Sequence, residues 1–323
     1  MKKILHVILI LLFSLTVITC AKKSDTPSTT TTTTTSNPLF IAVGASGTLL
    51  TSSDGITWDN RTSGTTYDLR AVAYDGSSTL VAVGYSGTIL TSSDGTTWTA
   101  QTSGISTDIN NVAYLDGTFA AIGDSGVLLT SSDGITWTNK TSSCGMTENQ
   151  WGIVLSETIG VTVGESSSIY SSTDSGSNCT KRNTGSIEFN EIFYGNSTFV
   201  VVGASGNILT SSDGINWTSR WFDTTYDFYG GAYTASNDSG NIEFVVVGES
   251  GKLLSSSNGT SWSTVTSLSS LTTGNIHGIA RGGSTWVVVG ASGYIQTLVD
   301  GDSDVTKRTS GTTQNLRRVF YKE

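Results

Sequence analysis

Short apolar runs alternate with polar turns along the chain from residue 39 onward. Within residues 68–101, the segments DLRAVAY, TLVAVG, TILTSS and TWTAQT fit four short strands, separated by turn residues at 75–76, 86–87 and 94–95. Asp-Gly between two such runs is a strong hairpin signal, because these residues adopt the backbone conformations that a tight turn requires. The pattern therefore predicts four antiparallel strands in this segment and no helix.

This four-strand pattern repeats about every 40 residues. A glycine at the end of an apolar run marks each unit: Gly44, Gly84, Gly123, Gly164, Gly203, Gly248 and Gly290. Repeats of this length that contain only short strands are typical of β-propellers, whose blades have four antiparallel strands each. A parallel β-solenoid is the alternative, and the hairpin turns disfavour it.

The two ends of the repeat region complement each other. Residues 39–43 read as a second strand with no first strand before it, whereas residues 315–323 match the first strand of the other units. Pairing the two would complete one blade and leave no long sheet edge open. We therefore predict an all-β fold, a seven-bladed propeller at 39–323, closed by the C-terminal strand joining the N-terminal blade.

The octapeptide TSSDGITW occurs at residues 51–58 and again at 130–137, and related copies occupy most units. Asp and Gly suit a tight turn between the third and fourth strands, and Trp at the start of the outer strand can pack between blades. The motif resembles the Asp-box (BNR) repeat of sialidases. In its seven short blades, the chain resembles photosystem II assembly-factor-like propellers more closely.

This resemblance implies a structural role for the boxes, on the face away from the usual ligand site. The motif residues are Asp54, Trp58, Asp94, Trp98, Asp133, Trp137, Asp174, Asp213, Trp217 and Trp262. The common Asp-box has one residue between Asp and Gly, whereas here the two are adjacent. The fourth copy keeps the common spacing, and Cys179 stands where its Trp would be.

The N-terminal segment has the pattern of an export signal. Residues 1–19 have a Lys-Lys head followed by an apolar run, and this run is too short for a spanning helix. Residues 17–20 resemble the lipobox of bacterial lipoproteins, which implies lipidation of Cys20 and attachment to a membrane. Ala21 after the cysteine favours the outer membrane, on its periplasmic side or at the cell surface. An ordinary cleaved signal is the alternative.

Residues 20–38 combine the candidate lipidated Cys20 with a Thr-rich stretch that contains almost nothing apolar. Such a composition cannot bury a core, so we expect a tether that holds the propeller away from the membrane. The formal net charge of the chain is −9. This charge argues against a nucleic acid as the partner, since binding to a phosphate backbone depends on basic residues.

Catalytic groups are scarce. The only histidines are His6, inside the signal segment, and His277, so a Ser-His-Asp arrangement could rest on His277 alone. No counterpart of the sialidase arginine motif precedes the first box. Glu191 is an acid on an innermost strand, where an apolar residue is more usual. We predict a protein that is not an enzyme, with a divergent glycoside hydrolase as the less favoured alternative.

Aligned inner strands place one polar residue per blade at the mouth of the central channel. The position before each strand holds Asp68, Asp108, Asn149, Glu188, Asp227, Asn275 and Asn315. These oxygens could bind cations, although Asp and Asn at the start of a strand more often cap a turn. Two residues further on lie the candidate ligand-binding residues: Arg70, Asn110, Trp151, Asn190, Tyr229, His277 and Arg317.

This second column mixes charges with aromatic rings. Closure of the ring would bring His277, Arg317 and Arg70 together as a basic patch, with Trp151 and Tyr229 across the mouth. Such a surface suits a carboxylate, an acidic peptide or a sugar. The alternative is that the arginines pair with the acidic column. We therefore predict a binding or scaffold module for a protein or peptide partner, with a glycan-binding module as the alternative.

Two further features bear on cofactors and crosslinks. Asp300, Asp302 and Asp304 alternate as in calcium loops, but the turn glycine and the bidentate Glu of such loops are missing, so Ca²⁺ is a weak candidate. We expect no cofactor. Cys144 and Cys179 could form a disulfide in an oxidising compartment or remain separate thiols.

Overall fold

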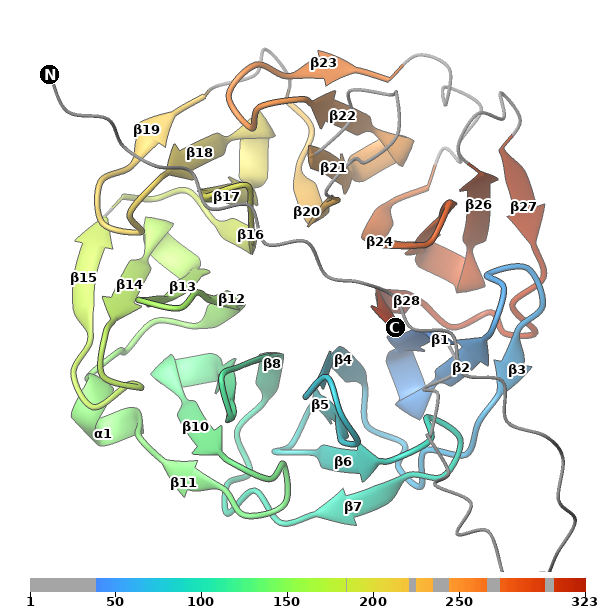
Figure 1. The fold of residues 1–323 in the computed structure, drawn as a ribbon, viewed down its shortest axis with the longest axis horizontal. Helices are drawn as coiled ribbons and strands as arrows, with labels where there is room; N and C mark the ends of the chain where they lie inside the picture. Colours follow the sequence, from blue (N-terminus) through green and yellow to red (C-terminus); the bar gives the residue numbers. More distant parts are fainter. Residues whose placement is uncertain (1–38, 184, 221–224, 235–243, 266–273, 300–304) are drawn as a thin grey trace, which may run out of the picture. The chain divides into compact units, whose positions relative to one another are not determined.

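The computed structural model describes residues 39–183, 185–220, 225–234, 244–265, 274–299 and 305–323. These residues form seven four-stranded antiparallel sheets arranged as blades around a central axis (Figure 1). Among them, the only α-helix is α1 (Thr141–Cys144), and no helix is long and apolar enough to span a bilayer.

The four strands of each blade follow one another from the inside of the ring to the outside. Blade 1 contains β28 (Leu316–Lys322), β1 (Leu39–Gly44), β2 (Leu49–Ser52) and β3 (Asp59–Asn60). Blade 2 contains β4 (Leu69–Tyr74), β5 (Leu80–Gly84), β6 (Ile89–Ser92) and β7 (Thr99–Gln101). Blade 3 contains β8 (Ile109–Leu115), β9 (Thr118–Gly123), β10 (Leu128–Ser131) and β11 (Thr138–Asn139). Blade 4 contains β12 (Gln150–Leu155), β13 (Gly160–Gly164), β14 (Ile169–Ser172) and β15 (Thr180–Asn183).

The remaining three blades follow the same order. Blade 5 contains β16 (Phe189–Gly195), β17 (Thr198–Gly203), β18 (Ile208–Ser211) and β19 (Thr218–Ser219). Blade 6 contains β20 (Phe228–Tyr233), β21 (Phe244–Gly248), β22 (Leu253–Ser256) and β23 (Ser263–Thr264). Blade 7 contains β24 (Ile276–Gly282), β25 (Thr285–Gly290), β26 (Ile295–Val299) and β27 (Thr306–Arg308).

The second strand of a blade is buried on both faces. In β5 every residue is buried, and the same is true of β21. Each sheet is packed between two neighbouring sheets, so its central strands bury side chains on both faces and read as continuous runs of apolar residues. The outer strands are mostly exposed, as in β7 and β19.

The ring closes as the sequence predicts. β28 pairs antiparallel with β1, with Phe320 opposite Ile41 and Lys322 opposite Leu39. β28 also contacts β24 of blade 7 and β4 of blade 2. The C-terminal strand therefore completes blade 1 and joins it to both of its neighbours, which confirms the predicted seven-bladed fold.

The Asp-box turns are closed by their own side chains. The Oδ1 of Asp54 accepts hydrogen bonds from the backbone N–H groups of Ile56 (2.7 Å) and Thr57 (2.9 Å), and the Trp58 indole N–H donates to the Gly55 carbonyl (3.0 Å). Gly55 has a φ of +74°, which favours glycine. A Cβ there would lie 2.9 Å from Val287 of blade 7, so the turn also packs against the preceding blade.

These turns give stability a dependence on pH. Hydrogen bonds from backbone N–H groups hold the pKa values of Asp54, Asp94, Asp133 and Asp213 below the ordinary value of 3.8. The carboxylates therefore stabilise the fold above about pH 4, and this contribution is lost as pH falls through their folded pKa values. Blade 6 has Asn258 instead, whose Oδ1 accepts the same two bonds, from Thr260 and Ser261 (2.9 Å each).

Replacing the four aspartates together by asparagine should therefore leave the fold intact and flatten its acid sensitivity. We expect the urea midpoints of parent and variant to differ little at about pH 7 and the parent to lose more stability by about pH 3. Equal losses in both proteins would contradict the assignment.

Candidate functional site

The seven candidate mouth residues share one backbone feature. In every blade the register between the inner and second strands shifts by one residue near the mouth, as between Leu69 and Ala71 opposite Gly84 and Val83. The residue left without a partner forms a β-bulge, and its side chain no longer follows the regular alternation of the strand. The seven bulge residues are Arg70, Asn110, Trp151, Asn190, Tyr229, His277 and Arg317.

The Asp/Asn column beside the bulges connects neighbouring blades. The Oδ1 of Asp68 accepts a hydrogen bond from the Ser46 backbone N–H (2.9 Å), in the turn of the preceding blade. Five further blade junctions repeat this bond, through Asp108, Asn149, Asp227, Asn275 and Asn315. The acceptor thus holds a turn that contains a left-handed serine, Ser46 at φ +53°, which is the capping role expected of Asp and Asn here.

Three consecutive inner strands make a basic sector of the mouth, which we define as Arg70 on β4, Arg317 on β28 and His277 on β24. All three side chains are partly exposed. Arg317 approaches Asp68 at 3.5 Å, whereas Arg70 has no carboxylate partner among the described residues. The Nε atoms of both arginines are buried without hydrogen-bond partners among those residues.

The surroundings of His277 favour its neutral form. Burial lowers its pKa, the hydrogen bond between its Nδ1 and the Leu316 carbonyl (2.8 Å) acts in the opposite direction, and the charges of Arg317 and Arg70 lower the pKa further. The carbonyl fixes the proton on Nδ1, which leaves Nε2 as an acceptor. The positive charge of the sector therefore belongs to the two arginines.

Tyr85 supports Arg70 and was missed in the sequence. The Arg70 guanidinium lies 4.4 Å from the centre of the Tyr85 ring and donates to its hydroxyl. Stacking on an aromatic ring holds a guanidinium in place without neutralising it. The signal was present in the sequence, since the residue after the unit glycine is Ala, Asp or Glu in every other blade.

The rest of the mouth carries acidic groups. The position of Tyr85 is occupied by Asp124, Glu165 and Glu249 in blades 3, 4 and 6. In blades 7 and 1, next to Arg317, it is occupied by Ala291 and Ala45. The mouth is therefore polarised, with a basic sector over blades 7, 1 and 2 and acidic groups over blades 3, 4 and 6, whereas blade 5 has Ala204 at this position.

Part of the candidate set is committed to the fold. The Asn110 amide is buried and donates to Asp124 (2.7 Å) and to the Gln150 carbonyl of blade 4 (3.0 Å). Asn190 likewise donates to the Phe228 carbonyl of blade 6 (2.8 Å). These two amides link adjacent blades and offer a ligand little, because their donors already have partners.

One expected placement is corrected. Tyr229 does not lie across the mouth from the basic sector, because its blade is next to blade 7 and its ring contacts His277 edge-on, with centroids 5.8 Å apart. Trp151, on blade 4, is partly exposed and does lie on the far side of the ring from blade 1 (Figure 1).

An ion pair crosses the channel below the mouth. Glu191 on β16 pairs with Arg318 on β28, although blades 5 and 1 are not neighbours in the ring. Glu191 also accepts a hydrogen bond from the Ile192 backbone N–H (3.0 Å). Burial raises the pKa of Glu191, and the Arg318 charge opposes the rise. Glu191, the acid considered for catalysis, is thus buried and paired.

The remaining predictions concern a disulfide, a calcium loop and the lipidated cysteine. Cys144 and Cys179 form a disulfide with their Cα atoms 4.7 Å apart, between the segment entering blade 4 and its outer hairpin. Asp300, Asp302 and Asp304 lie outside the described residues, as does Cys20. Within the described ranges, no group of three His, Cys, Asp or Glu side chains is arranged to hold a metal ion.

Comparison with known proteins shows the fold of the chain. No protein-family model and no curated protein sequence matches it. The solved structure of YCF48 bound to D1 peptide is 19% identical with a TM-score of 0.64, over 80% of this chain and 87% of that one.

YCF48 from Cyanidioschyzon merolae is 16% identical with a TM-score of 0.60, over 77% of this chain and 87% of that one. The computationally designed Ika8 protein is 12% identical with a TM-score of 0.59, over 80% and 91%. The likeness to YCF48 supports the resemblance to photosystem II assembly-factor propellers at the level of the fold. At these identities, the chain is similar to these proteins as a β-propeller.

Proposed function

We propose that the protein is an exported, lipid-anchored binding propeller of the Asp-box type, held through Cys20 and the 20–38 tether at the outer membrane. Its channel mouth holds a protein or peptide partner through a carboxylate of that partner. The observation that carries this proposal is the basic sector, in which Arg70 and Arg317 come from the neighbouring inner strands β4 and β28 and Arg70 lacks a carboxylate partner among the described residues. Guanidinium groups bind carboxylates by charge-assisted hydrogen bonds.

The polarised charge of the mouth suggests how a bound peptide is oriented. A peptide carboxylate directed toward Arg70 and Arg317 would leave the rest of the peptide over the acidic groups of blades 3, 4 and 6, where basic residues are favoured. The pair of Glu191 and Arg318 spans the channel beneath, so we expect a partner to lie on the mouth instead of passing through it. The similar propeller YCF48 has been solved with a peptide bound. This supports a peptide as the kind of partner.

Replacing Arg70 and Arg317 by serine should remove partner binding without unfolding the ring, since neither side chain is fully buried. We suggest placing a photoreactive amino acid at Tyr229 in the full chain and identifying its crosslinked products in intact cells. A discrete protein product is expected, and it should weaken at least about 10-fold in the serine variant.

The same photoreactive group at Ile215, on the Asp-box face, is the matched control and should not give that product. Products that are equal at both positions, or that persist in the serine variant, would contradict a binding site at the mouth. A glycan array with the same two proteins tests the glycan-binding alternative. If the parent protein binds a glycan and the serine variant does not, the ligand of the mouth is a sugar and not a peptide.

A further inference from the structure

Blade 4 differs from the other blades in its core. In four of the other blades, the end of the inner strand and the start of the second strand face each other as an aromatic pair, for example Tyr114 and Phe119, whose ring centroids are 4.6 Å apart. The box Trp packs against the same Phe, and Trp137 lies 6.4 Å from Phe119. Blades 1, 5 and 6 repeat this arrangement of three rings.

All three rings are absent from blade 4. Its inner strand ends in Leu155, which is opposite Gly160 in the register, and its box has Cys179 in place of Trp. Among the described residues, glycine occupies this second-strand position only here; the other six blades have Phe40, Leu80, Phe119, Phe199, Phe244 and Trp286. Residues that fill the junction between blades elsewhere are therefore small in this blade.

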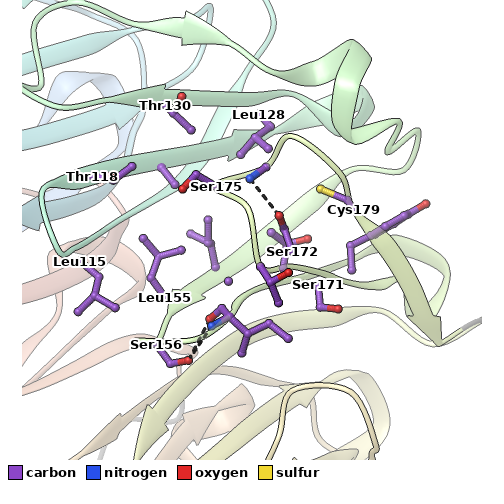
Figure 2. Close-up of a pocket in the computed structure, with 18 of the residues that line it drawn as sticks. Leu115, Thr118, Leu128, Thr130, Leu155, Ser156, Ser171, Ser172, Ser175 and Cys179 are labelled. Carbon is purple, nitrogen blue, oxygen red and sulfur yellow. Dashed lines mark hydrogen bonds between the residues drawn. The ribbon is translucent and has the colours of Figure 1, made fainter.

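A cavity of about 240 Å³ lies at this place, between blades 3 and 4 (Figure 2). Leu115 and Leu128 line it from blade 3, and Leu155 and Ile159 from blade 4. The disulfide between Cys144 and Cys179 forms part of its wall. The cavity therefore lies where aromatic rings fill the corresponding space in blades 1, 3, 5 and 6. The disulfide closes one side of it.

The lining indicates the kind of molecule that fits. Apolar cavities of about 150 Å³ are large enough to take up benzene, so this one accommodates a larger ring. Serine and threonine hydroxyls, among them Ser156 and Thr130, supply a few polar atoms around the apolar lining. Asp116 and Glu157 are exposed at its edge and oppose a negatively charged ligand.

We propose that this cavity is a binding site for a neutral, planar aromatic ring of about the size of indole. It lies at the end of the strands where the Asp-box turns are, away from the channel mouth, because β12 begins at the mouth with Gln150 and ends at the cavity with Leu155. The site is therefore separate from the proposed partner site, and either proposal can fail without the other.

The test titrates the full chain with indole by calorimetry. We expect saturable binding with a dissociation constant on the order of 0.1–1 mM. Indole-3-acetate should bind more weakly because of Asp116 and Glu157. N-acetyl-tryptophanamide distinguishes the source of the ring: binding comparable to that of indole assigns the site to a side chain of a polypeptide, and binding of indole alone assigns it to a small molecule.

Gly160→Phe restores the residue of the sister blades and should fill the cavity. A Cβ at Gly160 meets only the flexible end of Leu155 at 3.0 Å, so the substitution is sterically feasible. We expect at least about 10-fold weaker indole binding and a higher melting temperature. Ile135→Phe adds a ring at an exposed position of the blade 3 box and is the matched control, with binding unchanged.

If Gly160→Phe does not fold, Leu155→Tyr, which restores the facing tyrosine, takes its place. Absence of saturable indole binding by the parent protein would overturn the proposal. Binding that survives in the filled variant would overturn it as well.

Discussion

Deleting residues 315–323 is expected to unfold the protein or to lower its melting temperature by more than about 10 °C. The deletion removes β28, whose Leu316 and Val319 are buried, and leaves β1, β4 and β24 without their neighbour. No blade can bury both of its faces alone, so an open ring loses much more than the deleted contacts. Thermal unfolding of the full chain with and without these residues measures the effect.

A rearranged chain provides the control. Because Lys322 lies opposite Leu39 in the register of β28 and β1, the segment 315–322 can be placed before residue 39 through a short hairpin turn. This variant restores blade 1 from contiguous sequence, and its melting temperature should lie within a few degrees of that of the parent. A truncated protein as stable as the parent, or a rearranged one as unstable as the truncation, would contradict the role of closure.

Arg318→Met is the second change with a large expected effect. It leaves the Glu191 carboxylate, whose side chain is 3% exposed, without its cation in the centre of the ring. Removing one partner of a buried ion pair costs about 3–5 kcal/mol. Without Arg318 the pKa of Glu191 rises further, so the native state holds its proton to higher pH than the unfolded chain does. Stability of the variant should therefore fall as pH rises from about 5 to about 8.

The reverse substitution separates burial from pairing. Glu191→Gln leaves Arg318, whose side chain is 26% exposed and can reach water, so we expect a smaller loss of about 1–2 kcal/mol. The double variant Glu191→Leu with Arg318→Met should recover most of the stability lost in Arg318→Met, because no buried charge remains. Urea unfolding at two pH values measures all three. Equal losses of stability in the two single variants would contradict the deeper burial of Glu191 than of Arg318.

The periodic signals in the sequence determined the fold prediction. Unit length, hairpin turns and the match of residues 315–323 to an inner strand predict the blade count and the closure that the structure shows. Alignment of the repeats also identified the seven bulge positions, because their residue types vary whereas a nearby position of the same strand is apolar in most blades. Each of these features lies within one repeat or recurs from repeat to repeat. Both kinds can be recognised from the periodicity of a single sequence.

Contacts across the ring were beyond this reasoning. Aligning Glu191 with Arg318 shows that both are charged where the other blades have Ala, Gly or Asn, but not that the two side chains meet, since the width of the channel is not encoded in any one repeat. The same limit applies to Asn110 and Asn190, whose donors are used by the next blade. Gly160 departs from the repeat in the sequence itself, but a missing side chain predicts a cavity only when the packing of the neighbouring blade is known.

The bulges bear on how such a surface diversifies. A bulge residue stands outside the strand ladder, so mouth positions without a bond to the next blade, such as Arg70 and Trp151, can change in size or charge while the blades around them stay constant. Asn110 and Asn190 are exceptions, because their amides bond to the next blade. One ring could in this way acquire new specificities by substitutions at a handful of codons, with its folding left untouched.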